Sequence, residues 1–132
     1  MNLLAPLYAL ADRVRFRLHR DVGREGEDRA HRWLRRHGYL VTARNWRPPQ
    51  GGGEIDIVAM HLDRVVFVEV KSRAAGSPTA PERGVDAEKI VALRRAARDY
   101  LRRSGIDPGQ ARFDVVAVDG TTVQHLPDAF AL

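Results

Sequence analysis

Three charged side chains lie on two apolar segments that are otherwise suited to a protein core. Asp56 lies within the segment 54–59, and Glu69 and Lys71 lie at the end of the apolar run 65–70. Removing a charge from water is costly unless the charge is paired or binds a metal. Carboxylates are the protein ligands that Mg²⁺ prefers, and such sites commonly bind phosphate oxygens. The types and spacing of these residues therefore indicate metal-assisted hydrolysis of a phosphodiester bond.

This chemistry assigns a role to each residue. Asp56, Glu69 and the carbonyl oxygen of Val70 would hold Mg²⁺ or Mn²⁺. The cation would stabilise the transition state and acidify a bound water, which the amine of Lys71 would orient or help to deprotonate. The alternative is structural: Glu69 and Lys71 form an ion pair at a strand end, and Asp56 caps a turn.

Lysine is rare in this chain. Of the 22 basic residues only Lys71 and Lys89 are lysine, and the others are arginine. A lysine amine can shift its pKa and transfer a proton, whereas a guanidinium keeps its charge. The use of lysine directly after Glu69 and Val70 therefore favours a chemical role.

Two neighbouring strands are predicted to position these residues. Alternation in 54–59 and the β-branched run 65–70 are typical of strands, and the short connection 61–64 predicts a hairpin. Because side chains alternate along a strand, Glu69 and Lys71 should share one face. We expect this end of the two strands to carry the site.

A helix is predicted over residues 22–37, ending at Gly38. Helical spacing places Glu27 on the face that contacts the sheet, with Ala30, Trp33, Leu34 and His37, while Glu25 and Asp28 point elsewhere. Glu27 is therefore a candidate accessory acid. The alternative is that an acid in the first turn simply stabilises the helix.

The remaining elements are strands near 39–44, 112–118 and 121–126, and a second helix from about 86 to 103. The helix is expected to bury one apolar face, which consists of Ile90, Leu93, Ala97, Tyr100 and Leu101. Its other side carries arginines, a pattern that suits either a phosphate backbone or a solvated surface.

Four motifs resemble those of the small YraN-type proteins, a branch of the PD-(D/E)xK nuclease superfamily that is related to archaeal-type Holliday junction resolvases. They are Gly23-x-x-Gly26-Glu27-x-x-Ala30, Gly53-Glu54-Ile55-Asp56, Phe67-Val68-Glu69-Val70-Lys71-x-Arg73 and Arg112-Phe113-Asp114-Val115-Val116. Ile55 stands where the superfamily name has proline. The resemblance extends from about residue 20 to the C-terminus.

The resemblance implies an α/β fold with a restriction-endonuclease-like αβββαβ core, in which helices flank a mixed central sheet. It also implies metal-dependent endonuclease activity. In that scheme Asp56 and Glu69 are metal ligands, Lys71 is the catalytic lysine and Glu27 is an accessory acid.

Composition agrees with one nucleic-acid-binding domain. A chain of 132 residues with 44% hydrophobic residues can form a single core, and its net charge of +5 favours an anionic partner. Absence of cysteine excludes disulfides and thiolate metal sites, so any metal would be held by oxygen or imidazole ligands, which favours Mg²⁺ or Mn²⁺. The basic residues predicted to contact DNA are Arg44, Arg47, Arg73, Lys89, Arg94 and Arg98.

Residues 1–20 form a separate extension, apolar at first and then basic, before the nuclease-like domain at 21–132. The chain has no run of eighteen apolar residues and no secretory signal pattern, so we expect a cytoplasmic protein without stable membrane insertion. An amphipathic helix that docks on a partner or a membrane surface is one alternative for this segment.

Three functions agree with these sequence features. The first is a metal-dependent endonuclease that acts on DNA, including branched or Holliday-junction-like DNA, in repair or recombination. The second is a catalytically inactive nucleic-acid-binding module of the same fold, and the third is an adaptor recruited through residues 1–20. A homodimer would suit a four-way junction, because symmetric incisions need two-fold symmetry.

Overall fold

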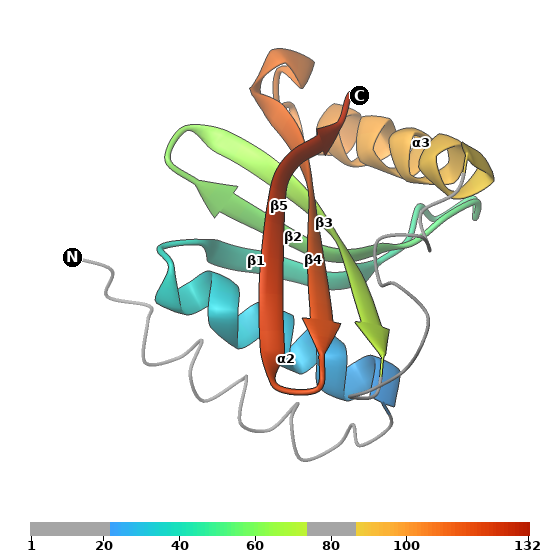
Figure 1. Ribbon diagram of the computed structural model, residues 1–132. Coiled ribbons are helices and arrows are strands. Elements are labelled where there is room, and N and C mark those ends of the chain that lie inside the picture. The colour runs from blue at the N-terminus through green and yellow to red at the C-terminus, as the bar shows by residue number, and fades with distance from the viewer. Residues whose placement is uncertain (1–21, 74–86) are drawn as a thin grey trace.

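The computed structural model describes residues 22–73 and 87–132 (Figure 1). The predicted N-terminal extension, residues 1–20, lies outside these residues. The described elements are α2 (Val22–Arg36), β1 (Leu40–Trp46), β2 (Ile55–His61), β3 (Arg64–Arg73), α3 (Ala87–Ser104), a short 3-10 helix (Pro108–Gln110), β4 (Ala111–Asp119) and β5 (Thr122–Phe130).

The strands form one mixed sheet in the order β1-β2-β3-β4-β5. Neighbouring strands are antiparallel except for β3 and β4, which are parallel and are connected through α3. A parallel connection of this kind needs a crossover, which a helix usually supplies. The predicted αβββαβ core is confirmed, and β5 extends it at one edge.

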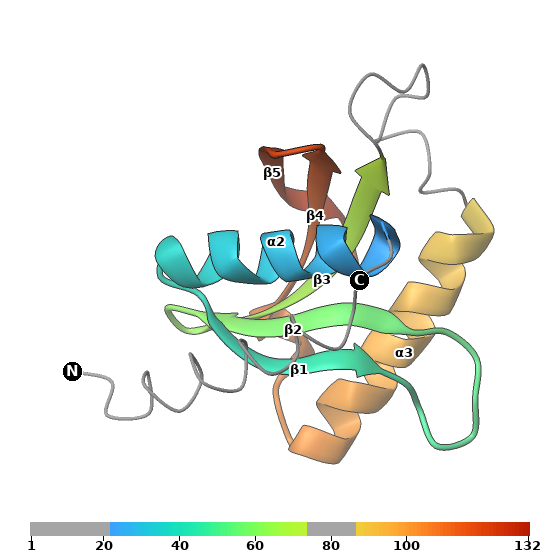
Figure 2. The same cartoon turned by 90° about the horizontal axis from the view of Figure 1, so that it is seen from below.

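The two helices lie on opposite faces of the sheet (Figure 2). Leu34 of α2 packs in a core with Val66 and Val68 of β3, whereas Leu93 of α3 packs in a second core with Phe67. Consecutive residues of β3 thus enter different cores, and burying such a side chain contributes roughly 1.5–3 kcal/mol. A shift of one residue would exchange the two faces, so this packing fixes the register that positions Glu69.

Two turns confirm local predictions. Helix α2 ends before Gly38, whose φ of 88° is in the left-handed region that glycine adopts readily. The β2–β3 hairpin pairs His61 with Arg64, so only Leu62 and Asp63 form its turn.

The predicted inner face of α2 needs a correction. Asp28 was expected to point away from the sheet, but it is buried and its Oδ1 lies 2.9 Å from Nη2 of Arg44 on β1. His31 is buried beside Arg44, whereas His37, which was expected on the apolar face, is exposed. The buried face of α2 therefore includes Asp28 and His31, because both contact Arg44 of β1. Helical spacing alone does not reveal this partner, which lies on another element.

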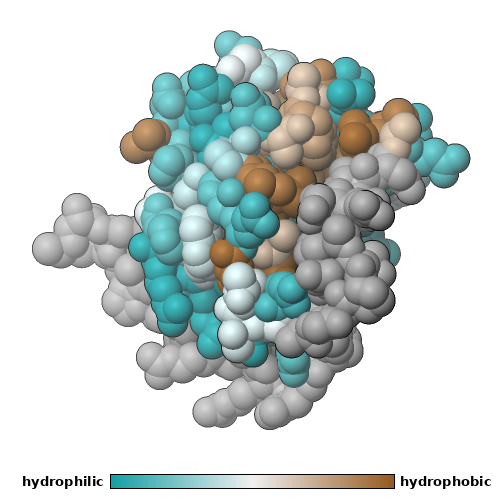
Figure 3. All heavy atoms as spheres, in the orientation of Figure 1, coloured by the Kyte–Doolittle hydropathy of each residue, from teal (hydrophilic) through white to brown (hydrophobic). Residues whose placement is uncertain are grey.

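Strand β5 is longer than the predicted segment 121–126. It continues past Pro127 to Phe130, whose ring stacks on Phe113 with a centroid distance of 4.6 Å. Pro127 is tolerated because β5 is an edge strand. On the face seen in Figure 1, hydrophilic residues predominate and hydrophobic residues form several patches, mainly from the middle to the upper right (Figure 3).

The described helices are all too short or too polar to cross a lipid bilayer.

Candidate functional site

Four elements converge at one end of the sheet. Because β2 and β3 are antiparallel, the beginning of β2, with Asp56, lies beside the end of β3, with Glu69 and Lys71. Helix α2 adds Glu27, and the first turn of α3 adds Lys89. The structure therefore brings together the charged residues that sequence spacing had placed on separate elements.

Close packing of α2 against β3 brings Glu27 to this end. A Cβ atom at Gly26 would collide with the side chain of Ser72 on β3. Glycine removes that obstacle, so the beginning of α2 can approach the strand. This close contact explains why the second glycine of the Gly23-x-x-Gly26-Glu27 motif is needed.

Asp56 lies just beyond the last residues through which β2 pairs with β3. The backbone N–H of Val70 donates a hydrogen bond of 2.8 Å to its Oδ2. Burial, followed by the charges of Glu69 and Glu27, raises the pKa of Asp56 from 3.8 to about 8 despite that hydrogen bond. Without a cation this carboxyl group is mainly protonated at neutral pH.

Glu69 is almost completely buried and lies on the α3 face, with Val65 and Phe67. Its Oε1 lies 3.3 Å from Nζ of Lys71 and also forms an ion pair with Lys89. Two ammonium groups thus compensate one buried carboxylate.

The two lysines differ in exposure and in pKa. The side chain of Lys71 is 15% exposed and that of Lys89 is 41% exposed. Burial and the hydrogen bond with Lys89 lower the pKa of Lys71. Burial also acts to lower the pKa of Lys89, but its hydrogen bonds to Glu69 and Lys71 outweigh burial and raise it. Lys71 is thus the lysine that loses its proton more readily.

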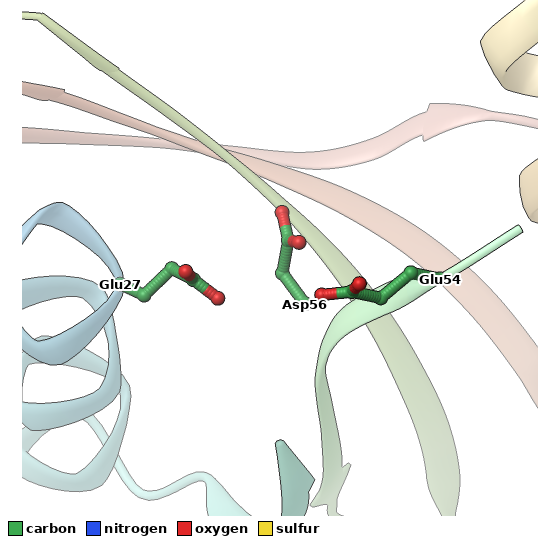
Figure 4. A group of neighbouring side chains, drawn as sticks. All are labelled: Glu27, Glu54 and Asp56. Carbon is green, nitrogen blue, oxygen red and sulfur yellow. The ribbon is translucent and has the colours of Figure 1, made fainter. Parts of the chain in front are cut away.

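Three carboxylates form a second grouping that shares Asp56 (Figure 4). Glu27, Glu54 and Asp56 each offer an oxygen, and these atoms lie within 4.8 Å of one another. Glu27 extends from α2 towards Glu54, which precedes β2, and Asp56 lies between them (Figure 4). An all-oxygen set of like charges suits a hard cation such as Mg²⁺, which would relieve the repulsion that raises the pKa of Asp56.

Sequence reasoning assigned no role to Glu54, a member of this grouping, or to Asn45, which contacts two of its members. Glu54 belongs to the Gly53-Glu54-Ile55-Asp56 motif, whereas Asn45 lies outside the four motifs. The side-chain amide of Asn45 donates hydrogen bonds to Glu27 Oε1 (2.7 Å) and Glu54 Oε1 (2.8 Å). The available signal was an asparagine inside a strand, because asparagine is depleted in strands.

A pocket of about 270 Å³ adjoins the carboxylates, and its lining consists of Gly53, Glu54, Asp56, Lys89, Ala92 and Leu93. Gly53 has a φ of 99°, and a Cβ atom there would lie 2.7 Å from the carbonyl oxygen of Ala92. Only glycine permits this approach of the loop to α3. The charged end of the site therefore opens onto a small and partly apolar space.

The predicted DNA-contacting arginines are in different environments. Arg44 has a 4% exposed side chain that is paired with Asp28, so its guanidinium holds α2 on β1 and is hidden from the surface. Arg47 is 73% exposed and its Nη2 lies 2.6 Å from Glu54 Oε2. We therefore exclude Arg44 from the candidate interface and keep Arg47 beside the site.

Two other predicted arginines lie on α3, and a third is at the end of β3. Arg98 is exposed, whereas Arg94 donates a hydrogen bond of 2.7 Å from Nε to the carbonyl oxygen of Ala131. The side chain of Arg73 lies outside the part of the chain that the structure describes.

Comparison with known sequences identifies the family. The model of the "Uncharacterised protein family UPF0102" matches residues 26–118. A UPF0102 protein of Solibacter usitatus is 50% identical over 117 residues, which cover 88% of this chain and 89% of the relative. A UPF0102 protein of Syntrophotalea carbinolica is 45% identical over 113 residues, or 83% of this chain and 90% of the relative. With its motifs, fold and sequence in agreement, the chain belongs to family UPF0102, the YraN family.

Proposed function

We propose that this protein is a metal-dependent endonuclease that hydrolyses phosphodiester bonds in DNA. The observation that carries the proposal is the convergence of Asp56, Glu69 and Lys71 with Glu27 at one end of a mixed sheet. An acid whose pKa is raised by partial burial and by neighbouring acids, as that of Asp56 is, is a recurring property of catalytic sites.

The proposed cation is Mg²⁺ or Mn²⁺. Asp56 and Glu69 are its first candidate ligands, with the carbonyl oxygen of Val70, and the grouping in Figure 4 adds Glu27 and Glu54. When bound, the cation would supply positive charge to the phosphate and acidify an attacking water.

The chain's own residues divide the remaining work. Lys71, with its lowered pKa, is suited to orient the attacking water and to accept its proton. Lys89 keeps its positive charge and is suited to contact a non-bridging phosphate oxygen. Glu69 holds both amines in place through its ion pairs.

The proposed substrate is DNA, with branched DNA such as a four-way junction as its preferred form. Arg47 and Arg98 are exposed and are proposed to contact the phosphate backbone, with Arg73 and Arg94 as further contacts. A cytoplasmic homodimer would present two such sites to a symmetric junction.

A second candidate function has one specific observation in its favour. Lys71 and Lys89 already neutralise Glu69 without a cation. A nucleic-acid-binding module that lacks catalysis would have this self-compensated ion-pair cluster as part of its fold.

Cleavage of labelled duplex, flap and four-way-junction DNA would separate the two candidates. We expect cutting only with Mg²⁺ or Mn²⁺, and a loss of at least about 100-fold in Asp56→Asn and in Lys71→Ala, as for removal of groups that act on the reacting atoms. Asp63→Asn, at the exposed hairpin turn, is the matched control and should cut like the wild type.

Salt-sensitive binding of junction DNA without cleavage in either metal would contradict the endonuclease and favour the binding module. Cleavage that survives in Asp56→Asn would locate the chemistry elsewhere in the protein.

A further inference from the structure

We propose that Asn45 is a positioning residue that sets the separation of the Glu27 and Glu54 carboxylates for a divalent cation. The inference rests on the metal site proposed above. Asn45 does not belong to the predicted catalytic set, and it touches two members of the carboxylate grouping at once. Its role follows from its place in the sheet, its backbone conformation and its two hydrogen bonds.

The register of the sheet places Asn45 at the centre of the grouping. Trp46 of β1 pairs with Ile55 of β2, so the preceding Asn45 lies alongside Asp56. From this position the side chain reaches Glu27 on α2 as well as Glu54 before β2. The amide of Asn45 on β1 thus connects α2 with the segment before β2, next to Asp56.

The backbone at this position restricts which residue can serve. Asn45 has a φ of 51°, in the left-handed region, which asparagine and glycine adopt more easily than other residues. For most other residues the left-handed backbone conformation costs roughly 1–2 kcal/mol. Glycine has no side-chain amide and aspartate has no side-chain donor at neutral pH, whereas asparagine combines the left-handed backbone with two N–H donors on one nitrogen.

The two hydrogen bonds oppose a repulsion. Glu27 and Glu54 would separate if nothing held their negative oxygens close, and each accepts one N–H of the same Asn45 amide. Groups that orient ligands in this way contribute about 10- to 100-fold to metal affinity or activity in other proteins. We therefore expect Asn45 to act on cation binding before it acts on any chemical step.

Calorimetric titration of the full chain with Mg²⁺ and with Mn²⁺ tests this role without relying on cleavage. Asn45→Gly keeps the left-handed backbone and removes the amide, whereas Asn45→Ala removes the amide and also strains the backbone. Both should bind the cation at least about tenfold more weakly than the wild type. The matched control is Asp128→Gly on β5, another left-handed position (φ 53°), which should bind like the wild type.

The outcomes separate this inference from the proposed function. Wild-type affinity in Asn45→Gly would overturn the role of Asn45 and leave the metal site standing. A wild type that binds neither cation would overturn both. A wild type that binds but does not cut would reject the endonuclease and retain Asn45 as an organiser of the site.

A kinetic measurement distinguishes positioning from lost stability. In Asn45→Gly the Mg²⁺ concentration for half-maximal cleavage should rise by the factor found in calorimetry. Partial unfolding would lower the maximal rate without moving that concentration, and such a result would overturn the positioning role.

Discussion

Asp56 and Asp114 are aspartates of the same sheet, the first half-buried and the second fully buried, and their surroundings are opposite. Asp114, on β4, accepts two hydrogen bonds of 2.8 Å from Arg112 and one of 3.0 Å from the N–H of Asp128, and His125 Nε2 lies 2.6 Å from its Oδ2. Burial acts to raise the pKa of Asp114, but its hydrogen bonds outweigh burial and lower it.

Asp56 accepts a hydrogen bond from the N–H of Val70, and its charged neighbours include Glu69 and Glu27. Its pKa is raised to about 8. The difference shows that burial alone does not decide what an acid does. Hydrogen-bond donors and positive charges around Asp114 stabilise its ionised form, so Asp114 has a structural role. The acids around Asp56 destabilise its ionised form, and a bound metal ion would supply the missing positive charge.

The largest expected difference is in stability. Asp114→Asn should lower the free energy of unfolding by roughly 3–5 kcal/mol, because Arg112 loses its buried counter-charge. Asp56→Asn should instead raise it without metal, because asparagine is neutral in both states whereas ionisation of Asp56 at neutral pH stabilises the unfolded wild-type chain. Urea unfolding in the presence of EDTA at neutral pH measures both, and equal losses would remove the distinction between the two acids.

A smaller effect is expected from pH. The pKa of Asp56 rises from 3.8 to about 8 on folding, so the folded protein retains a proton that the unfolded chain has released. The free energy of unfolding that this proton contributes is therefore lost progressively as the pH rises from about 4 towards 8. Between about pH 6 and about pH 8 the metal-free wild type should lose roughly 2 kcal/mol relative to Asp56→Asn. Parallel stability curves for the two proteins in EDTA would contradict the raised pKa.

The smallest effect is stabilisation by the cation. Mg²⁺ at ten times its dissociation constant should stabilise the wild type by about 1.4 kcal/mol. His125→Gln, which removes the His125 ring from Asp114, Trp33 and Tyr39 and leaves the carboxylate grouping intact, should respond equally, whereas Asp56→Asn should not respond. Thermal unfolding with and without Mg²⁺ measures this, and a normal response of Asp56→Asn would place the cation elsewhere.

Much of the fold could be predicted from the sequence because its signals are local. Alternation along 65–70 assigned Glu69 to the face of Val65 and Phe67, and that assignment is confirmed. Gly38 marked the end of α2, and the resemblance supplied the αβββαβ order. The inner face of α2 was wrong in part, because the burial of Asp28 depends on Arg44 from another strand.

The site was predicted less completely for the same physical reason. Residue types and spacing on two neighbouring strands were enough to select Asp56, Glu69 and Lys71 as partners. They could not reveal that the amide of Asn45 connects Glu27 with Glu54, because those contacts span 18 and 9 positions of the chain. They also could not reveal that Arg44 is buried in an ion pair.

The sequence by itself determined which residues alternate between the two cores and which charged residues could do chemistry, because periodicity and residue type are properties of short segments. The tertiary structure alone decided how those charges act on each other. It set the raised pKa of Asp56, the pairing of Glu69 with two lysines and the carboxylate grouping around Asn45. Electrostatic interactions depend on distances and burial, and both exist only once α2, β1, β2, β3 and α3 have packed together.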